Sequence, residues 1–387
     1  MISYGKQYID SKDISAVRKV LLSDWLTQGP LISKFEFELK KYFGAKYCSV
    51  VSNGTAALHL AGLALGWKKG DIILTSPISF LATSNCILYS GATPDFIDID
   101  KTNYNIDTNK LEEKLKKLKS LSKKVVAVVA TDYAGNPCNW KYLKQLASKY
   151  NFILINDNCH AIGATYYNNK SYAVKYADIV THSYHPVKNI TTGEGGAILT
   201  NNKEIFEKIN TLRSHGIEKN SKEKLARKGL WYYEMHELGY NYRITDIQCA
   251  LGISQLKKIN KFIKRKREIA KIYDEQFSED SIFKIPKVEK NYGHAYHLYP
   301  LQINFGKESE KRIFFKKLYN NKIKLQVHYI PIHLQPYYRK NYGFKKGDYP
   351  IAENFYKKEV SIPIYFSLKK KEIYRVINKI KFFLRNK

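Results

Sequence analysis

The sequence contains few cysteines and no long apolar run, and these absences remove several classes of protein. The five cysteines are widely spaced, and none of them forms a Cys-x-x-Cys pair. This pattern indicates neither a disulfide framework nor a zinc site. The first ten residues, "MISYGKQYID", lack the apolar core of a signal peptide. The longest aliphatic run, "VVAVVA" at 125–130, is too short to span a bilayer. We therefore expect a cytoplasmic protein without a membrane segment.

Acidic residues are also scarce, with 35 Asp and Glu against 65 Lys and Arg and a formal net charge of +30. One interpretation is a nucleic-acid-binding regulator. The other is a set of amphipathic surface helices, because residues 112–124, 255–273 and 369–387 alternate cations with apolar residues at helical spacing. The cations are scattered rather than gathered in one arm, which favours solvated helix faces and no nucleic-acid partner. A basic surface would still attract an anionic small molecule.

Two histidine pairs raise the question of a metal site. They are His182-x-x-His185 and His294-x-x-His297. Neither pair has the i, i+4 spacing of a helical zinc motif or an accompanying acid, so we expect no metal.

Short β-rich runs alternate with helical stretches over the first two thirds of the chain. Such alternation predicts βαβ units and a mostly parallel sheet covered on both faces, that is, an α/β fold. The helices are expected at 55–65, 108–118 and 141–150. The strands are expected at 47–52, 71–76, 94–100, 124–133, 151–157, 177–183 and 196–200.

The chain is long enough for two or three structural units. We predict a large domain over residues 1–245, which includes an N-terminal helical segment starting at Asp10 with Ile14, Val17 and Leu21 on its buried face. Residues 246–387 are predicted to form a long linking helix from Thr245 and a small α/β domain. The strands of this small domain are expected in 295–305 and 323–333.

Polar groups follow several of the predicted strands, and ligands of open α/β sheets gather at the carboxyl ends of strands. After strand 47–52 comes "SNGTAA", in which Ser52, Asn53 and Gly54 form a turn and Thr55 and Ala56 start a helix. A helix N-terminus on such a turn is a potential phosphate site. A plain helix cap explains the same residues equally well.

An aspartate and a lysine follow two other strands. Asp157 ends the apolar run "FILIN", where a buried carboxylate needs a partner, either a structural arginine or a protonated ring nitrogen. Ser183 ends the strand 177–183, and Lys188 follows it in a loop that continues into a glycine-rich turn. An exposed surface lysine is the ordinary alternative. A phosphate turn, a buried aspartate and a loop lysine, in this order, are typical of a pyridoxal phosphate enzyme.

Several longer segments resemble the DegT-type nucleotide-sugar aminotransferases, and the similarity covers essentially the whole chain. The resemblance implies fold type I, with a seven-stranded sheet in the large domain, and pyridoxal 5'-phosphate as cofactor. The segments are "LTQGP", "SNGTAALHLA", "TSPISFLATSNC", "DYAGNP", "DNCHAIGATY", "SYHPVKNITTGEGGA", "LRSHGI" and "LGYNYRITDIQCALGISQL".

Within this family, the lysine segment and residues 328–356 are most similar to the members that act in pseudaminic acid biosynthesis. That similarity implies transfer of an amino group from L-glutamate to carbon 4 of a UDP-4-keto-6-deoxy-N-acetylaminosugar. Alternatives are another UDP-4-keto-6-deoxy sugar, of bacillosamine or legionaminic type, or a pyridoxal-dependent sugar dehydratase. The last is disfavoured by Lys188, because those relatives typically have histidine at this position.

The resemblance also implies roles for individual residues. Lys188 matches the Schiff-base lysine that moves the proton, and Asp157 matches the partner of the pyridine nitrogen. The other cofactor positions are Thr55, Ala56 and Ser183 (phosphate), Phe80 (ring stacking), His160 (ring hydroxyl) and Asn241, which reaches the phosphate of the neighbouring subunit in a homodimer. The substrate positions are Tyr4, Thr27, Gln28, Arg243, His328 and Tyr329.

Some of these positions have alternatives or departures. Arg243 has an independent physical case, because a guanidinium suits a diphosphate. Phe80 could instead be a core aromatic, and His160 a satisfied core histidine. The sequence departs from the family at three asparagines. An acid often stands at the position of Asn156, alanine is usual at Asn158, and the most similar group tends to have proline at Asn189.

Overall fold

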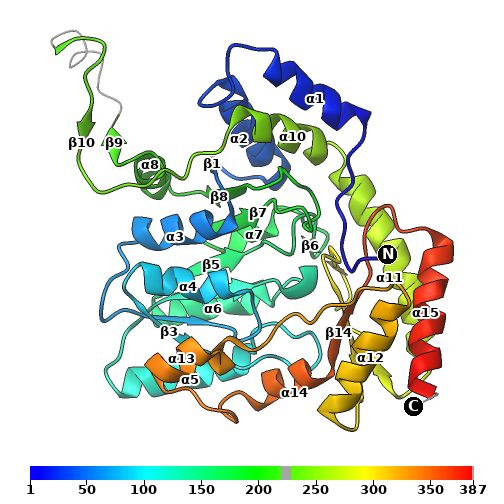
Figure 1. The fold of residues 1–387 in the computed structure, drawn as a ribbon. Helices are drawn as coiled ribbons and strands as arrows, with labels where there is room; N and C mark the ends of the chain where they lie inside the picture. Colours follow the sequence, from blue (N-terminus) through cyan, green and yellow to red (C-terminus); the bar gives the residue numbers. More distant parts are fainter. Residues whose placement is uncertain (219–227, 386–387) are drawn as a thin grey trace.

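The computed structural model describes residues 1–218 and 228–385, and its centre is a seven-stranded sheet (Figure 1). The strand order is β1-β8-β7-β5-β4-β2-β3. Strand β8 is antiparallel to β1 and β7, and the other neighbours are parallel. The predicted mostly parallel α/β sheet is therefore confirmed. The strands are β1 (Tyr47–Val51), β2 (Ile72–Thr75), β3 (Thr93–Phe96), β4 (Val125–Thr131), β5 (Ile153–Asp157), β7 (Ile179–Ser183) and β8 (Gly196–Thr200).

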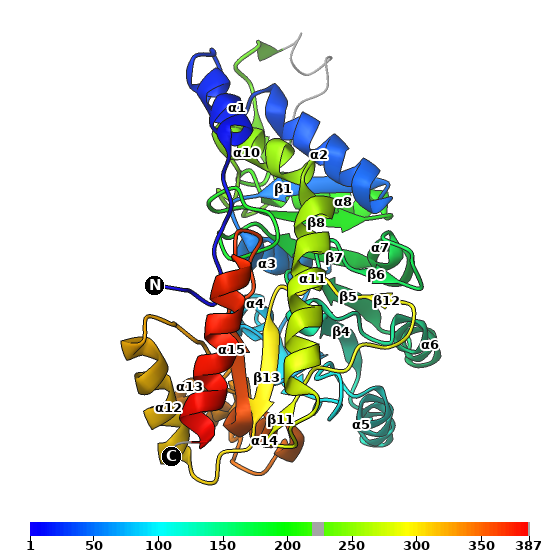
Figure 2. The ribbon, with the colours of Figure 1, turned by 90° about the vertical axis from the view of Figure 1, so that its right-hand side faces the viewer.

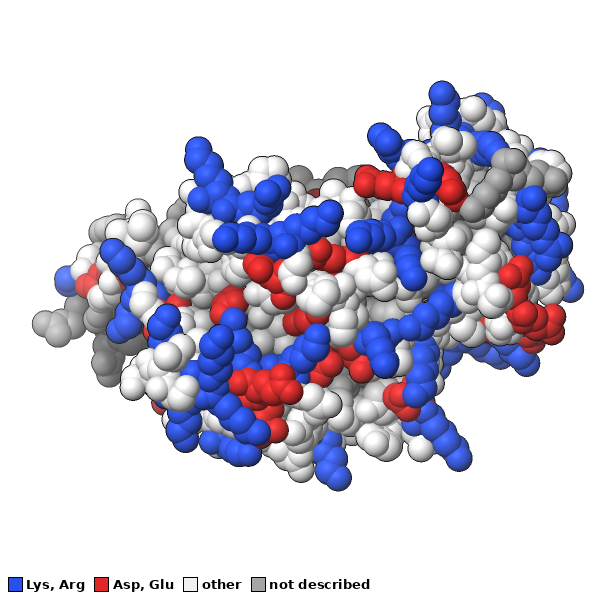
Figure 3. Space-filling view, turned by 90° about the horizontal axis from the view of Figure 1, so that it is seen from below, with Lys and Arg blue, Asp and Glu red and all other residues white. Residues whose placement is uncertain are grey.

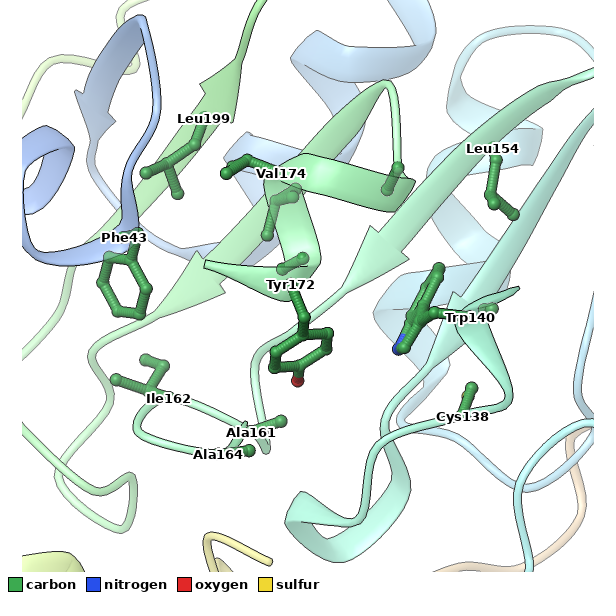
Figure 4. Close-up of a cluster of buried hydrophobic side chains, with 14 of the residues drawn as sticks. Phe43, Cys138, Trp140, Leu154, Ala161, Ile162, Ala164, Tyr172, Val174 and Leu199 are labelled. Atoms are coloured by element: carbon green, nitrogen blue, oxygen red, sulfur yellow. The ribbon is translucent and has the colours of Figure 1, made fainter. Parts of the chain in front are cut away.

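Helices cover both faces of this sheet, because successive strand residues point to opposite sides. Leu154 belongs to one hydrophobic core and its neighbour Ile155 to the other. The first core, part of which is shown in Figure 4, contains side chains of α2 (Pro30–Phe43), α5 (Thr108–Ser120), α6 (Trp140–Tyr150) and α7 (Tyr172–Tyr176). The second contains side chains of α3 (Gly54–Ala64), α4 (Leu81–Tyr89) and α8 (Lys203–Leu212).

The C-terminal part contains a three-stranded antiparallel sheet of order β11-β13-β14 and a hydrophobic core of its own (Figure 2). The strands are β11 (Phe283–Lys284), β13 (Tyr299–Ile303) and β14 (Glu359–Ile362). The helices of this part are α12 (Glu308–Asn320), α13 (Pro336–Tyr342), α14 (Pro350–Lys358) and α15 (Lys370–Arg385). The division of the chain at residue 245 stays a prediction.

Two predictions for the C-terminal part were wrong. Residues 323–333 do not form a strand: they make single bridges at Ile323 and Gln326 and then enter a 3-10 helix, where Pro331 has no N–H for a ladder. The place in the sheet belongs to β14. The long helix predicted from Thr245 is two helices, α10 (Asp246–Leu256) and α11 (Ile259–Phe277). Lys258, at the junction, binds Asp13 of the N-terminal helix at 2.5 Å.

The first helix, α1 (Ser11–Leu21), begins where it was predicted but buries a different face. Ile14 and Leu21 are exposed, whereas Asp13 and Val20 are buried. The reason is the polar contact with α10 and its junction, since Asp13 accepts hydrogen bonds from Gln255 and Lys258. Ile14 and Leu21 consequently face away from their own chain.

Short elements complete the connections around these two sheets. Strand β6 pairs with β12, and β9 pairs with β10 in the ribbon that projects at the upper left of Figure 1. They are β6 (Thr165–Tyr166), β9 (Ile217–Glu218), β10 (Glu234–Met235), β12 (Tyr292–Gly293), and the 3-10 helices η1 (Tyr133–Gly135) and η2 (Ile332–Leu334).

The basic helices are amphipathic, as predicted. Helix α15 buries Ile373, Val376, Ile377 and Ile380, while its lysines lie largely on the outside. Figure 3 shows Lys and Arg spread over one face of the molecule with acidic side chains between them. Within the described ranges, no helix is long and apolar enough to cross a membrane, and no cluster of three or more His, Cys, Asp or Glu suits a metal ion.

Candidate active site

Asp157 is the last residue of β5 and lies buried at the carboxyl end of the sheet. Its Oδ2 accepts a hydrogen bond from Thr83 Oγ1 at 2.7 Å, and its Oδ1 accepts one from the Cys159 backbone N–H at 3.2 Å. No arginine forms an ion pair with Asp157 in the part of the chain that the structure describes. The alternative prediction, that a structural arginine pairs with Asp157, is therefore wrong. The carboxylate is available to a cationic ligand group.

A second buried carboxylate, Asp132, fixes the strand end that carries Asp157. Asp132 lies beyond the end of the neighbouring strand β4 and is fully buried. Its Oδ2 accepts hydrogen bonds from Asn156 at 3.2 Å, Asn158 at 3.0 Å and Tyr172 at 2.6 Å. Two of the three departures from the family pattern are thereby explained. The two amides that flank Asp157 satisfy a buried anion.

The other oxygen of Asp132 binds residues of the core shown in Figure 4. Its Oδ1 accepts from the Cys138 backbone N–H at 2.7 Å and from Trp140 Nε1 at 2.9 Å. Burial raises the pKa of Asp132, and these hydrogen bonds oppose that rise. A carboxylate with this many donors is a rigid anchor, because removing one partner leaves a buried polar group unpaired.

Lys188 lies in the loop between β7 and β8, on the same side of the sheet as Asp157, and is partly buried. Burial lowers the pKa of its amine, while the nearby Cys159 thiol and Asp157 carboxylate raise it. The net direction is downward, so a larger fraction of the amine is neutral at a given pH than for a free lysine. A neutral amine is the nucleophilic form. Lys188 is therefore not an ordinary solvated lysine.

The residue after Lys188 holds the loop in place. Asn189 is buried, donates to the Ile162 carbonyl at 2.9 Å and the Ala295 carbonyl at 3.3 Å, and accepts from Lys266 Nζ at 2.7 Å. A proline, which the family resemblance leads one to expect at this position, would have no side-chain amide for these bonds. The third departure from the family pattern thus replaces a stiff residue by a hydrogen-bonded one.

The N-terminus of α3 meets the end of β7 in a tight contact. A side chain at Gly54 would place its Cβ 2.7 Å from Ser183 Cβ, so glycine is needed for this approach. Asn53 caps the helix by accepting the Ala56 N–H at 2.8 Å. The amides of Gly54 and Thr55, rather than that of Ala56, are consequently the available donors of the first turn. Together with the Ser183 hydroxyl they form a small cradle suited to a phosphate.

His160, His328 and Tyr329 lie together above the strand ends. The Ala134 N–H donates to His160 Nδ1 at 3.3 Å, so the proton of the neutral ring is on Nε2, which is 3.0 Å from Tyr329 Oη. Burial is the largest cause that lowers the pKa of His160 well below its ordinary value. His160 is a hydrogen-bonded neutral imidazole and not a cation.

Phe80 is 55% exposed, which excludes a role as a core aromatic. It caps α4 without a side-chain hydrogen bond, and its ring centroid lies 6.0 Å from that of Tyr329. Tyr4 approaches the same group from the N-terminus, with its ring centroid 5.1 Å from that of His328.

The remaining predicted residues form a second group at the start of α10. Thr27 pairs with Thr245 through a backbone bridge, and Gln28, which has a φ of 55°, is next to it. Asn241 bridges Ser214, and Arg243 Nη1 donates to Ser214 Oγ at 3.1 Å. Thr27, Gln28 and Asn241 are exposed, and Arg243 is half-buried. In the described chain their side chains form no hydrogen bond or ion pair with Lys188 or Asp157, so one chain does not by itself join the two groups.

Sequence reasoning did not identify Thr83 or Asp132 as parts of the site. The role of Thr83 could not be predicted from the sequence, because it depends on α4 lying beside β5. Thr83 and Asp157 are 74 positions apart. Asp132 carried a usable signal, since it follows a buried strand in the same way as Asp157 does.

The residues near the carboxyl ends of the strands, called the first group, fit pyridoxal phosphate. They are Lys188, Asp157, Ser183, His160, Phe80 and the turn at Gly54. That cofactor supplies an aldehyde that bonds to amines and a pyridine ring that takes up electrons. Lys188 provides an amine with a lowered pKa, Asp157 provides an anion free of a cationic partner, and the Gly54 cradle provides amides for a phosphate. His160 and Phe80 lie beside the same space.

The family model described as the DegT/DnrJ/EryC1/StrS aminotransferase family matches residues 7–381. The chain belongs to this family. It is 40% identical over 388 residues to the UDP-4-amino-4,6-dideoxy-N-acetyl-beta-L-altrosamine transaminase of Campylobacter jejuni, with 98% of this chain and 99% of that protein covered. The family resemblance stated from the sequence motifs is confirmed.

Solved structures agree with this assignment. The aminotransferase PseC of Helicobacter pylori, involved in the biosynthesis of pseudoaminic acid, is similar with a TM-score of 0.90 at 31% identity, covering 100% of both chains. The PLP-form of a putative sugar aminotransferase of Streptococcus pneumoniae, Spr1654, is similar with a TM-score of 0.88 at 25% identity, covering 99% of this chain and 98% of that one. The fold is therefore that of the fold type I enzymes, and the chain is a sugar aminotransferase of a family that uses pyridoxal phosphate.

Replacing Phe80 with alanine should weaken cofactor binding without lowering thermal stability. An aromatic ring stacked on the cofactor contributes about 1 kcal/mol, so the Kd for pyridoxal phosphate should rise about fivefold. Because the side chain is exposed, Tm should stay unchanged; a buried phenylalanine would cost about 3–5 kcal/mol. Phe37→Ala, at a 58% exposed position on α2, is the matched control and should change neither quantity. A fall in Tm for Phe80→Ala alone would argue for a packing role.

Proposed function

We propose that this aminotransferase transfers the amino group of L-glutamate to carbon 4 of a UDP-4-keto-6-deoxy-N-acetylaminosugar and that it acts in pseudaminic acid biosynthesis.

 The observation that supports this proposal is a lysine amine, Lys188, that lies close enough to the carboxylate of Asp157 to be affected by its charge, in a chain that is 40% identical over 98% of its length to a transaminase named for a UDP-linked 4-amino-4,6-dideoxy sugar. L-Glutamate as the donor is part of the proposal.

Each residue of the first group has a defined task in this reaction. Lys188 would hold pyridoxal phosphate through its amine, and the same amine would serve as the group that moves a proton during the transfer. Asp157 would keep the pyridine nitrogen of the cofactor protonated, and Thr83 and the Cys159 N–H hold the carboxylate in position. His160 donates from Nε2 to the Tyr329 hydroxyl. Its fixed tautomer lets it orient an oxygen without exchanging a proton.

The binding tasks fall to the remaining predicted residues. The Gly54 and Thr55 amides and the Ser183 hydroxyl would hold the phosphate, whereas the amide of Ala56, which was also predicted for this role, donates to Asn53. Phe80 covers the ring. Tyr4, His328 and Tyr329 face the sugar.

The second group would serve the site of a partner subunit in a homodimer. It includes Asn241, Thr27, Gln28 and Arg243, of which Arg243 suits the diphosphate of a nucleotide sugar. Large apolar side chains nearby are exposed and would be covered by a second copy. They are Ile14, Leu21, Leu22, Trp25 and Leu26 on and after α1, and Leu230, Trp231, Tyr233, Met235 and Leu238 on the projecting ribbon.

A panel of UDP-linked 4-keto-6-deoxy-N-acetylaminosugars, supplied with ¹⁵N-glutamate, tests this function. The expected result is transfer of the label to carbon 4 of the sugar with the pseudaminic acid configuration, identified by NMR of the product. Labelling of a bacillosamine- or legionaminic-type sugar in its place would correct the substrate and keep the reaction. No label in any sugar, with cofactor bound, would overturn the proposal.

A further inference from the structure

A chain of hydrogen bonds connects His328 to a buried glutamate. His328 Nδ1 lies 2.8 Å from Ser361 Oγ, and the Ser361 hydroxyl lies 2.5 Å from Glu359 Oε1. The other oxygen of Glu359 accepts the backbone N–H of His328 at 2.8 Å. Both Ser361 and Glu359 belong to β14 and are buried. Glu359 thus binds His328 at two points, directly at the backbone and through Ser361 at the ring.

The charge of Glu359 sets the direction of these bonds. Burial raises the pKa of Glu359 to about 7, while the Ser361 hydroxyl, the Lys311 ammonium and the His328 N–H oppose that rise. Above this pKa the carboxylate accepts and does not donate, so the Ser361 proton points to Glu359. The Ser361 oxygen must then accept from His328, which places the ring proton on Nδ1 and leaves Nε2 with a lone pair.

The imidazole of His328, whose Nε2 has the free lone pair, lies near Lys188. Burial and then the charge of Lys188 lower the pKa of His328 to about 3, so the ring stays neutral. Nε2 makes no hydrogen bond to the residues that the structure describes. It is also not one of the described polar atoms that are completely buried without a partner, so it is accessible. The ring of Tyr4 and the adjacent Tyr329 lie beside it. Nε2 is consequently open to a ligand.

We propose that Glu359 and Ser361 are positioning residues that hold neutral His328 in its Nδ1–H form, so that Nε2 offers a hydrogen-bond acceptor to an N–H or O–H group of the bound sugar. The identity of the ligand as a sugar rests on the proposed function. The arrangement selects for a donor at this point of the substrate, because a sugar that places an acceptor there would leave two lone pairs facing each other.

The substitution Glu359→Gln reverses the chain of bonds while keeping the side-chain volume. The amide has one acceptor oxygen, which the His328 N–H occupies, and its NH₂ group then donates to Ser361. The Ser361 proton turns to His328 Nδ1, and the ring proton moves to Nε2. In the wild type, ¹⁵N NMR of the histidine-labelled holoenzyme, at a pH above the pKa of Glu359, should show protonated Nδ1 and unprotonated Nε2. Glu359→Gln should exchange the two, and His328→Gln identifies the signals.

Kinetics provide the second measurement. Glu359→Gln should lower kcat/KM for the keto sugar about 10- to 100-fold, because a donor then faces a donor. The absorbance of the cofactor bound to Lys188 should persist. Ser361→Ala, a smaller change that keeps the variant foldable, should lower kcat/KM about tenfold and release the ring from a single tautomer. The matched control is Glu353→Gln, at a buried glutamate that accepts from His333 Nε2 at 3.0 Å, and it should leave kcat/KM unchanged.

Two results would overturn this inference. One is a wild-type His328 that carries its proton on Nε2. The other is an unchanged kcat/KM in Glu359→Gln or Ser361→Ala when the NMR spectrum shows the altered ring. The first result does not depend on which sugar is aminated, because the NMR experiment needs no substrate. The second is measured with the keto sugar that the wild type aminates. Loss of the proposed function would appear separately, as a wild-type holoenzyme that transfers no amino group.

Discussion

Lys188→Ala is expected to lower the rate of amino transfer by at least about 10³-fold, because the variant loses both the amine that bonds to the aldehyde and the group that carries the proton. The protein should still fold, since the Lys188 side chain makes no hydrogen bond in the described structure and its loop is held through Asn189. The visible absorbance of the lysine-linked cofactor should disappear as well. Stopped-flow absorbance and ¹⁵N transfer from glutamate measure the two effects.

The control for this experiment is Lys141→Ala, which removes an exposed lysine on α6. It should keep both the absorbance and the rate. A Lys188→Ala protein that turned over substrate near the wild-type rate would refute the mechanism, and with it the proposed role of the loop. Added small amines that restore part of the rate to Lys188→Ala would support the proton-carrying role specifically.

Asp157→Asn should give the second largest loss. An opposite charge at hydrogen-bond distance changes a pKa by about 1 to 3 units. Each pKa unit corresponds to about a tenfold change in the equilibrium constant for protonation. Without the carboxylate, the pyridine nitrogen loses its proton at working pH and the ring takes up electrons less readily. The rate should therefore fall between about 10- and 10³-fold, measured as kcat with saturating cofactor.

Two comparisons separate this electrostatic effect from damage to the fold. Thr83→Val removes the hydroxyl that donates to Asp157 Oδ2 but keeps the charge, so its loss should be much smaller. Asp178→Asn changes a carboxylate at the opposite end of the sheet, where it accepts the Leu154 N–H at 2.8 Å, and should leave kcat unchanged. Equal losses in Asp157→Asn and Thr83→Val would contradict the role of the charge.

The fold of the first two thirds of the chain could be predicted well because its signals are local. Buried parallel strands are short apolar runs, and the intervening helices carry apolar residues at their own period. The C-terminal part was harder: the apolar segment 323–333 has the composition of a strand, yet β14 occupies the sheet. Which of two apolar segments pairs with β13 depends on packing against α12 and α15, and a local pattern does not contain that information.

The same limit applies to α1. Its apolar spacing predicted Ile14 and Leu21 on the inner face, but the ion pair between Asp13 and Lys258 turns the helix the other way. A buried charge that finds its partner outweighs a few aliphatic contacts, because an unpaired buried carboxylate is far more costly. A sequence pattern does not show that partner when it is 245 residues away.

The sequence alone was enough to predict which residues would form the cofactor site. Lys188, Asp157 and the turn before α3 follow β7, β5 and β1 of one mostly parallel sheet, and the geometry of such sheets brings the carboxyl ends of parallel strands to one edge. Only the tertiary structure decided what supports these groups. Asp132 is joined to Asn156 and Asn158, and His328 to Ser361 and Glu359, by hydrogen bonds between segments that the chain alone does not relate. Such bonds form only when packing has brought the segments together, and packing is a property of the whole fold.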